Sequence, residues 1–216
     1  MAKIQTSQEG WKFVGGRLCL DFINTVGGRL NSGEVLRDKL ADYNHLLEWS
    51  RLAGVTSQTE SRNLAGYAAS HQHAAQATRE RAVLLREALF RIFNSAVEGR
   101  RPREGDLDML SREVQSAWAH ERLTHTGGAF GWIWEHSDAA LDRILWPVSL
   151  SAGELLTSGD LSRLRQCGGN ECGWMFLDTS RNRSRLWCDM KDCGNRAKVR
   201  RFRKRQQRGH RLARST

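Results

Sequence analysis

The sequence predicts an α+β fold that is mostly α-helical. A helical N-terminal domain with a short strand and a β-hairpin should precede a small cysteine-rich module that ends in a basic helix. Three observations lead to this prediction. Only two prolines interrupt the 216 residues, which favours long helices. Apolar residues recur at helical spacing over much of the chain. Four of the five cysteines fall between Cys167 and Cys193, where the most basic stretch begins. We place the domain boundaries at residues 1–159, 160–205 and 206–216, the last being a basic tail.

The stretch FVGGRLCLDFINTVGGRL predicts a short strand near its centre. Its residues alternate as in a half-buried strand, with Leu18, Leu20 and Phe22 on one face and Cys19, Asp21 and Ile23 on the other. The glycine pairs of the repeated word VGGRL indicate turns at both ends. A ligand pocket can be lined by Cys19, Asp21, Asn24 and Thr25. A strand edge followed by turn caps is the simpler interpretation of the same residues.

Helical patterns dominate from residue 35 onward. The first places Leu36, Leu40, Tyr43 and Leu47 on one face and stops at Gly54. Ser57 and Glu60 have the spacing of a capping box for the next helix. A long pattern then runs to about Glu98, with a stripe formed by Leu85, Leu89, Ile92 and Ala96, and Gly99 ends it. Asp106 can cap a further helix that carries Leu107, Leu110, Val114 and Trp118.

A β-hairpin is predicted around Gly127-Gly128, a dipeptide suited to a tight turn. Phe130, Trp132 and Trp134 alternate after it and should share one face. We then expect a helical stretch that starts at Ser137 and bends at Pro147. Its core residues should be Leu141, Ile144, Leu145, Leu155 and Leu156. A short turn at residues 161–164 leads into the cysteines.

The charge is unevenly distributed along the chain. Residues 161–216 hold 16 Lys or Arg and 4 Asp or Glu, whereas residues 1–160 hold 18 and 20. A mildly acidic domain is therefore followed by a strongly basic module, which suggests a polyanionic partner for the second part. The N-terminus has no apolar signal region, and no run approaches the ~20 apolar residues of a membrane span. We expect a cytoplasmic protein, whose cysteines bind metal or stay reduced instead of forming disulfides.

The four clustered cysteines follow the spacing Cys167-x4-Cys172-x15-Cys188-x4-Cys193. Two close pairs separated by a modest loop let each pair hold one side of a tetrahedral zinc ion, for which thiolates are favoured structural ligands. The intervening loop has a plausible strand at each end and a polar turn at residues 179–184. A knuckle, a hairpin, a second pair and a helix in that order predict a treble-clef-like finger. One fully ligated zinc ion has no open position for water, so its role should be structural.

Other uses of four cysteines stay open at this point. They can be buried thiols, although the pairing argues against this. The x4 spacing differs from the x2 spacing of a thioredoxin-like redox motif. An iron–sulfur cluster also uses four thiolates, but we rank it below zinc because the surrounding sequence offers no redox partner site.

The stretch RLRQCGGNECGWMFLDTSRNRSRLWCDMKDCGNRAKVRRFRKR closely resembles the CGNR zinc finger, which is named for the residues found here at Cys193–Arg196. The matching features include both cysteine pairs, Asp178-Thr179-Ser180, Asn182, Trp187 and Met190. Upstream, GGRLCLDFINTV resembles the start of the ABATE domain, which typically precedes this finger. The two resemblances together cover nearly the whole chain. They imply a protein of a mainly bacterial family described as stress-induced transcription regulators.

The sequence after Cys193 predicts a basic helix whose start is held by the metal. Helix nucleation is costly, and the positive end of a helix favours a thiolate. Val199 and Phe202 with small Ala197 form a narrow apolar edge that can pack on Trp174 and Trp187. Candidate nucleic-acid contacts are Arg196, Lys198, Arg200, Arg201, Arg203, Lys204 and Arg205 on the helix, and Arg181, Arg183 and Arg185 in the loop. The alternative is a solvated face that only keeps the protein soluble.

Asn195 and Arg196 have two possible roles. They can read base edges, or the Asn195 amide can cap the hairpin while Arg196 pairs with Asp178. Beyond Arg205 the chain has no apolar periodicity, which predicts fraying in the free protein.

We carry three functional hypotheses forward. The first is a zinc-dependent DNA-binding transcription regulator, whose N-terminal domain senses a small-molecule effector or forms a homodimer. The second is an RNA- or ribosome-associated binding protein; we favour DNA over RNA because of the family resemblance. The third is an enzyme with its pocket in the N-terminal domain. No phosphate loop, His–Glu metal motif or nucleophile elbow supports catalysis, so we predict a non-enzyme associated with the bacterial nucleoid.

Overall fold

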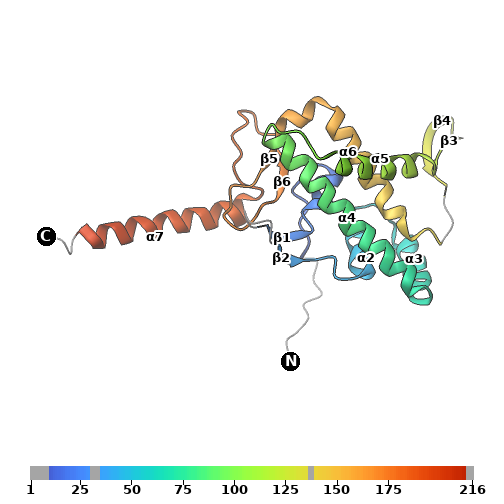
Figure 1. Ribbon diagram of the computed structural model, residues 1–216, viewed down its shortest axis with the longest axis horizontal. Coiled ribbons are helices and arrows are strands. Elements are labelled where there is room, and N and C mark those ends of the chain that lie inside the picture. Colours follow the sequence, from blue (N-terminus) through green and yellow to red (C-terminus); the bar gives the residue numbers. More distant parts are fainter. Residues whose placement is uncertain (1–9, 30–34, 136–138, 213–216) are drawn as a thin grey trace.

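The computed structural model describes residues 10–29, 35–135 and 139–212, with the backbone alone for 35–36 and 208–212. It confirms an α+β fold that is mostly α-helical, with a cysteine cluster after the helical region (Figure 1). The elements in chain order are α1 (Leu18–Ile23), β1 (Val26–Arg29), β2 (Val35–Asp38), α2 (Tyr43–Leu52), α3 (Gln58–Ser70), α4 (Gln72–Val97), α5 (Glu104–Trp118), β3 (Glu121–Thr126), β4 (Ala129–Trp134), η2 (Leu141–Ile144), α6 (Leu145–Thr157), η3 (Gly159–Arg163), β5 (Leu164–Gln166), β6 (Met175–Leu177), η4 (Met190–Gly194) and α7 (Asn195–Leu212). Among the described residues, no helix is long and apolar enough to cross a membrane.

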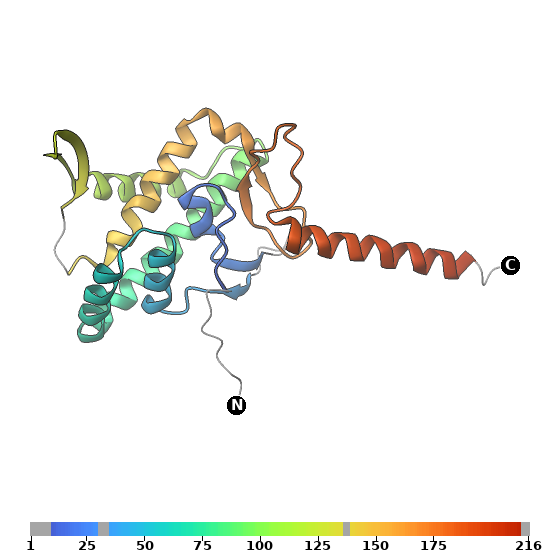
Figure 2. The same ribbon diagram turned by 180° about the vertical axis from the view of Figure 1, so that it is seen from behind.

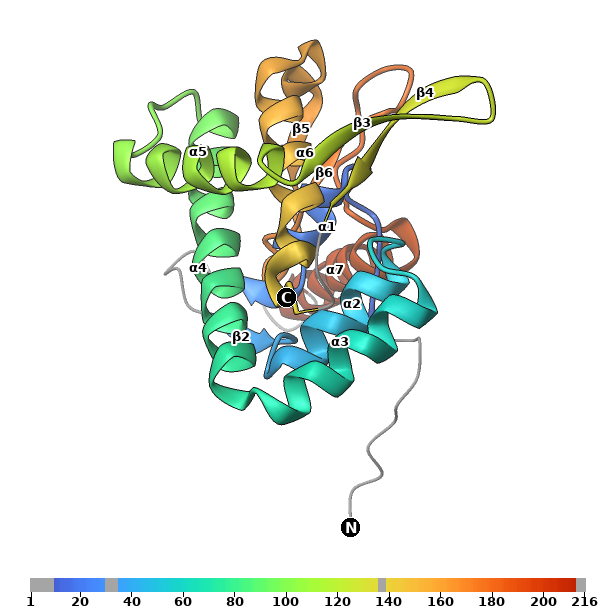
Figure 3. The same cartoon turned by 90° about the vertical axis from the view of Figure 1, so that its right-hand side faces the viewer.

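The predicted strand at residues 18–23 is wrong, because these residues form the short helix α1 at the centre of the molecule. Helices α4 and α6 pack against it (Figure 3). Cys19, Leu20, Phe22 and Ile23 are all almost completely buried. A helix enclosed on most sides is apolar nearly all round, and over six residues that composition resembles a strand. Gly15 permits the close turn into α1, since a Cβ there would lie 2.7 Å from Leu20 Cβ.

The pattern that starts at residue 35 divides into a strand and a helix. Residues 35–38 form β2, which pairs antiparallel with β1, so Leu36 belongs to a strand and not to the predicted helix. The helix α2 starts only at Tyr43, after Asp42 accepts a hydrogen bond from the backbone N–H of His45. The Asp42 cap explains the late start, because it ends the extended segment and satisfies a free backbone donor.

The longer helices follow the prediction with two corrections. The capping box of Ser57 and Glu60 is confirmed at the start of α3, and Gly99 with a φ of 66° follows α4. A break at His71 separates α3 from α4. Asp106 does not cap α5, which starts two residues earlier; its buried carboxylate instead accepts hydrogen bonds from Arg91. The expected apolar stripe of α5 is also only partly buried, since Leu107 and Trp118 are exposed.

The β3–β4 hairpin is confirmed, and both glycines of its turn have positive φ angles. Its aromatic face is largely exposed at Phe130 and Trp132, while Trp134 reaches the buried Trp146 with ring centroids 5.6 Å apart. The expected helix start at Ser137 lies outside the described residues. Beyond it, the 3-10 turn η2 leads directly into α6, so Pro147 lies in the first turn of α6, where its missing N–H costs little.

Strand β6 joins the C-terminal module to the helical domain. Its pairing with β5 is antiparallel, and both of its faces are buried. Met175 and Leu177 belong to the main apolar core, whereas Phe176 packs in a second cluster with the cysteines. The side chain of Asn24, 2% exposed, completes the junction, because its amide donates to the Met175 carbonyl at 2.8 Å and its oxygen accepts from the Met175 N–H at 2.9 Å.

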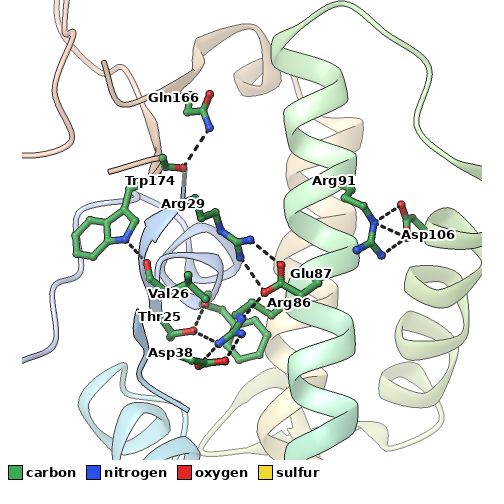
Figure 4. A network of polar contacts seen from close by, with 12 residues as sticks. Thr25, Val26, Arg29, Asp38, Arg86, Glu87, Arg91, Asp106, Gln166 and Trp174 are labelled. Carbon is green, nitrogen blue, oxygen red and sulfur yellow. Dashed lines mark hydrogen bonds and ion pairs between the residues drawn. The ribbon is translucent and has the colours of Figure 1, made fainter. Parts of the chain in front are cut away.

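A buried polar network holds the β1–β2 hairpin on α4 (Figure 4). The guanidinium of Arg86, 1% exposed, donates to both oxygens of Asp38 at 2.7 Å. Arg29 donates to both oxygens of Glu87 at 2.6 and 3.0 Å. Two bidentate pairs on consecutive helix residues therefore fix the hairpin, which forms one wall beside the cysteines.

Replacement of Asn24 tests whether the two modules share one folding unit. Asn24→Ala leaves the backbone N–H and carbonyl of Met175 unpaired in a buried strand, so we expect a loss of about 2–5 kcal/mol of unfolding free energy. Urea unfolding followed by circular dichroism measures this loss. The exposed Asn63→Ala in α3 is the control, and we expect it to stay within about 0.5 kcal/mol. A loss as small as that of the control would contradict the junction described above.

Candidate metal centre and basic helix

The four predicted cysteines meet at one point. Their sulfur atoms all lie within 4.8 Å of one another, and all but Cys172 are buried. The Sγ atoms of Cys172 and Cys188 are 3.5 Å apart, and those of Cys188 and Cys193 are 3.7 Å apart. Zinc–sulfur bonds of about 2.3 Å in a tetrahedron place the sulfurs about 3.8 Å apart, so the residues present fit this ion. The cluster is the site of one structural zinc ion.

The first cysteine pair lies in a tight turn after β5. The backbone N–H of Cys188 donates to Cys167 Sγ at 3.3 Å, which ties the first pair to the second. Gly169 leaves room inside this turn, because a Cβ there would lie 3.4 Å from Cys193 Sγ and 3.5 Å from Cys167 Sγ. Gly169, which lies between the two cysteines of the first pair, is therefore part of the site, and the sequence stretch Cys167-Gly-Gly is its signal.

Electrostatics favour a dication at this position. Hydrogen bonds from the Cys172 and Cys188 thiols lower the pKa of Cys167 to about 2, whereas the contact with Cys167 raises the pKa of Cys172 to about 12. One thiolate among four sulfurs is thus stabilised, but further ionisation is opposed by like charge. A bound Zn²⁺ removes that opposition and lets all four cysteines ligate as thiolates.

The loop between the two pairs does not form the predicted hairpin. Strand β6 starts it, but residues 184–187 are not a strand, and β6 pairs instead with the upstream β5. Buried Asp178 organises the polar turn, since it accepts hydrogen bonds from Ser180 Oγ at 2.6 Å and the Arg185 N–H at 2.9 Å. Hydrogen bonds to this carboxylate therefore fix the conformation of the loop, in place of the hydrogen bonds between paired strands that we expected.

Arg185 has a different surrounding from the other loop arginines. Its guanidinium donates to the carbonyl oxygens of Trp187 and Cys188 and lies 4.3 Å from the centre of the Phe176 ring. These contacts hold the second ligand segment in place. Arg181 and Arg183 are exposed and keep their charges in solvent.

The second cysteine pair leads directly into the basic helix. Asp189 accepts a hydrogen bond from the Lys191 N–H, and η4 forms a π-helical turn that contains Cys193. A Cβ at Gly194 would lie 2.3 Å from Met190 Sδ, so a side chain at this position would displace the exposed Met190 side chain. Cys193 and Gly194 thus build the start of α7.

Asn195 and Arg196 do not make the structural contacts expected of them. The Asn195 amide donates to the Lys191 carbonyl at 3.0 Å and does not cap a hairpin. Arg196 pairs with Asp192 at 2.9 Å and lies 3.5 Å from Cys193 Sγ, so Asp178 is not its partner. Both side chains lie on the exposed side of the helix start.

Helix α7 extends away from the rest of the protein (Figures 1 and 2). The expected packing of Val199 and Phe202 on the tryptophans is wrong: these side chains are 50% and 61% exposed, and only Ala197 is buried. The projecting direction of the helix removes them from Trp174 and Trp187. Its backbone also continues to Leu212, beyond the limit near Arg205 that we expected.

The four residues considered for an N-terminal pocket all have internal partners. Cys19 is completely buried, and Asp21 accepts a hydrogen bond from the Gly15 N–H at 2.8 Å. Asn24 binds the Met175 backbone, and Thr25 donates to the Phe22 carbonyl. The strand geometry on which the pocket depended is absent, and these contacts give the four residues structural roles.

Metal analysis of the purified protein should give one zinc per chain. Cys188→Ser removes one ligand, so we expect the zinc content to fall below half. Because β6 lies in both cores, Cys188→Ser should also lower the unfolding midpoint of the helical domain. The finger and the helical domain should unfold together in one transition. Cys19→Ala, which changes the cysteine outside the cluster, should retain one zinc. A separate transition for the finger, with the helical midpoint unchanged, would show that the cores are independent.

Two family models match the chain. The ABATE model, described as "Putative stress-induced transcription regulator", matches residues 16–159, and the CGNR zinc finger model matches residues 163–206. Neither description is that of an enzyme family. A search of curated proteins returns no match. With the first match covering well over half of the chain, and with the four cysteines of the second gathered at one point, the protein belongs to the ABATE family and carries a CGNR zinc finger.

Proposed function

We propose that the protein is a zinc-dependent DNA-binding transcription regulator in which α7 contacts DNA. The observation that carries this proposal is an exposed basic helix projecting from a metal-held base. Helix α7 has nine Lys or Arg and no Asp or Glu among its 18 residues. Such a helix repels itself and gains stability when phosphates neutralise it.

The dimensions of α7 suit a duplex. Eighteen residues at 1.5 Å per residue give a helix about 27 Å long. The major groove of B-DNA is about 12 Å wide and admits one α-helix. In the described part of the chain, no other element runs alongside the outer part of α7, so a duplex can approach it from several sides (Figure 2).

Phosphate contacts and base contacts come from different parts of this surface. The side chains of Lys198, Arg201, Arg203, Lys204 and Arg205 are exposed and suited to phosphates. Asn195 and Arg196 lie in the first turn, and their side chains can reach base edges once the helix enters a groove. Exposed Arg181 and Arg183 add a second basic surface in the loop.

The N-terminal domain gives the proposed regulator its second module. We assign it a sensing or dimerisation role, as a regulator needs a part that responds to a signal or pairs two copies of the chain. Its junction with β6 supports this role, because a change in the helical core is transmitted to the finger through one shared strand. The proposal places the protein in the cytoplasm, at the nucleoid.

Genome-wide crosslinking of bound DNA and RNA in cells tests the choice of nucleic acid. We expect recovery of a limited set of double-stranded DNA sites. Recovery of transcripts or ribosomal RNA in place of DNA would assign the basic helix to RNA and overturn the DNA proposal.

The contribution of α7 can be measured in vitro. A variant with Arg200, Arg201 and Arg203 changed to Gln should bind duplex DNA more weakly, and the slope of log K against log salt should fall by about 2–3. The matched control changes the exposed Arg62, Arg101 and Arg112 to Gln, which removes the same charge from the N-terminal domain. Equal binding by both variants would show that α7 is not the contact surface.

A further inference from the structure

A cleft of about 360 Å³ lies between the β1–β2 hairpin and the zinc site. Three parts of the chain that are distant in sequence line it: the segment at Lys12, the hairpin with Gly27 and Arg37, and the finger with Trp174 and Arg196. Its volume is at the lower end of the roughly 300–1,000 Å³ typical of ligand sites. None of the sequence-predicted sites includes Lys12, Arg37 or Lys39.

Two of the cations in this cleft already have acidic partners. Lys12 pairs with Asp189 at 3.3 Å and Asp192 at 3.0 Å. Arg196 pairs with the same Asp192 and donates to Cys193 Sγ. These contacts tie the N-terminal segment to the finger and leave little free positive charge on either residue.

Arg37 and Lys39 are not compensated in this way. Among the described residues, neither forms an ion pair with a carboxylate, although Glu171 also lines the cleft. The ammonium of half-buried Lys39 donates to the Gly10 carbonyl and lies 5.3 Å from the Trp11 ring centre and 5.7 Å from that of Trp174. Burial and the nearby Arg37 and Lys12 lower the pKa of Lys39, so an anion placed here would relieve an electrostatic cost.

The cleft opens onto the surface of α7. Asp192 and Arg196 line the cleft and also line a groove along one side of the helix, which continues to Arg203 and Lys204. A single polyanion can therefore follow the basic side of the helix, pass the paired Asp192 and Arg196, and reach Arg37 and Lys39. A separate small anion would use only one end of this path.

We infer that the cleft binds a phosphate of the DNA backbone next to the segment that lies along α7. This inference rests on the proposed function and makes the N-terminal domain a direct part of the DNA interface. The exposed Arg37 guanidinium suits bidentate contact with phosphate oxygens, and Lys39 supplies a point charge deeper in the cleft.

The test is the salt dependence of duplex DNA binding by the full zinc-loaded chain. Arg37→Gln, and Arg37→Gln combined with Lys39→Gln, are compared with a control that changes Arg62 and Arg112 to Gln. We expect the double variant to bind several-fold more weakly than the control, with a salt slope lower by about 1–2. The single Arg37 variant, which alters an exposed side chain, should lower the slope by about 1 even where Lys39→Gln reduces stability.

Each other outcome overturns the inference in a recognisable way. If the α7 variant loses DNA binding but both cleft variants bind DNA as well as the control does, the cleft is not part of the DNA interface. The proposed function then stands. If the unaltered protein does not bind DNA, both the proposed function and the cleft inference are wrong. A lower zinc content in the Arg37 variant shows that this cation stabilises the metal site instead. Calorimetric binding of inorganic phosphate at constant ionic strength by the unaltered protein, lost in the cleft variants while their DNA affinity is unchanged, assigns the cleft to a free phosphate compound.

Discussion

The burial of strand β6 on both faces is the constraint on which the rest of the structure depends. Side chains alternate along a strand, so three residues send Met175 and Leu177 into the helical core and Phe176 toward the cysteines. Neither core is complete without this strand. Asn24 matches the backbone of Met175 in both directions, which fixes the strand in one register. Zinc binding and helical packing therefore stabilise the same segment.

This constraint also explains how a strongly charged helix can project from the protein. Seven Lys or Arg residues between Arg196 and Arg205 repel one another, and the exposed part of α7 has few packing contacts to offset that repulsion. The start of the helix is held by Cys193 in the zinc site, by Gly194 against Met190, and by the pairing of Arg196 with Asp192. Since nucleation is the costly step, a fixed first turn removes that cost, and the following turns only have to propagate the helix. The outer turns remain available for a partner that supplies negative charge.

Local features of the sequence predicted the fold and the site well. The capping box at Ser57, the paired glycines of the β3–β4 turn and the four cysteines each depend on residues close together in the chain, and all three are confirmed. Features that depend on distant partners were missed. The alternation at residues 18–23 reflects enclosure of α1 by α4 and α6, and the strand that pairs with β6 lies before the first cysteine. The spacing of Asp106 favours a cap, but its actual partner, Arg91, lies on another helix and cannot be inferred from local sequence.

The proposed DNA interface has one part that the local sequence predicts, α7, and one part that depends on distant contacts, the cleft. The charges on α7 lie close together in the chain, so their density is visible in the sequence. Lys12, Arg37 and Lys39 are isolated within the mildly acidic N-terminal part. The β1–β2 pairing, the Lys12 contacts and the hydrogen bonds of β1 with Cys172 and Trp174 bring them beside the finger. Asp192 stands at the meeting point, because it binds both Lys12 and Arg196. A phosphate held by Arg37 and Lys39, as proposed, would lie beside these two ion pairs, and Arg196 belongs to the first turn of α7. Occupation of the cleft would therefore place a negative charge next to the contacts that hold the base of α7, the helix that we propose binds DNA.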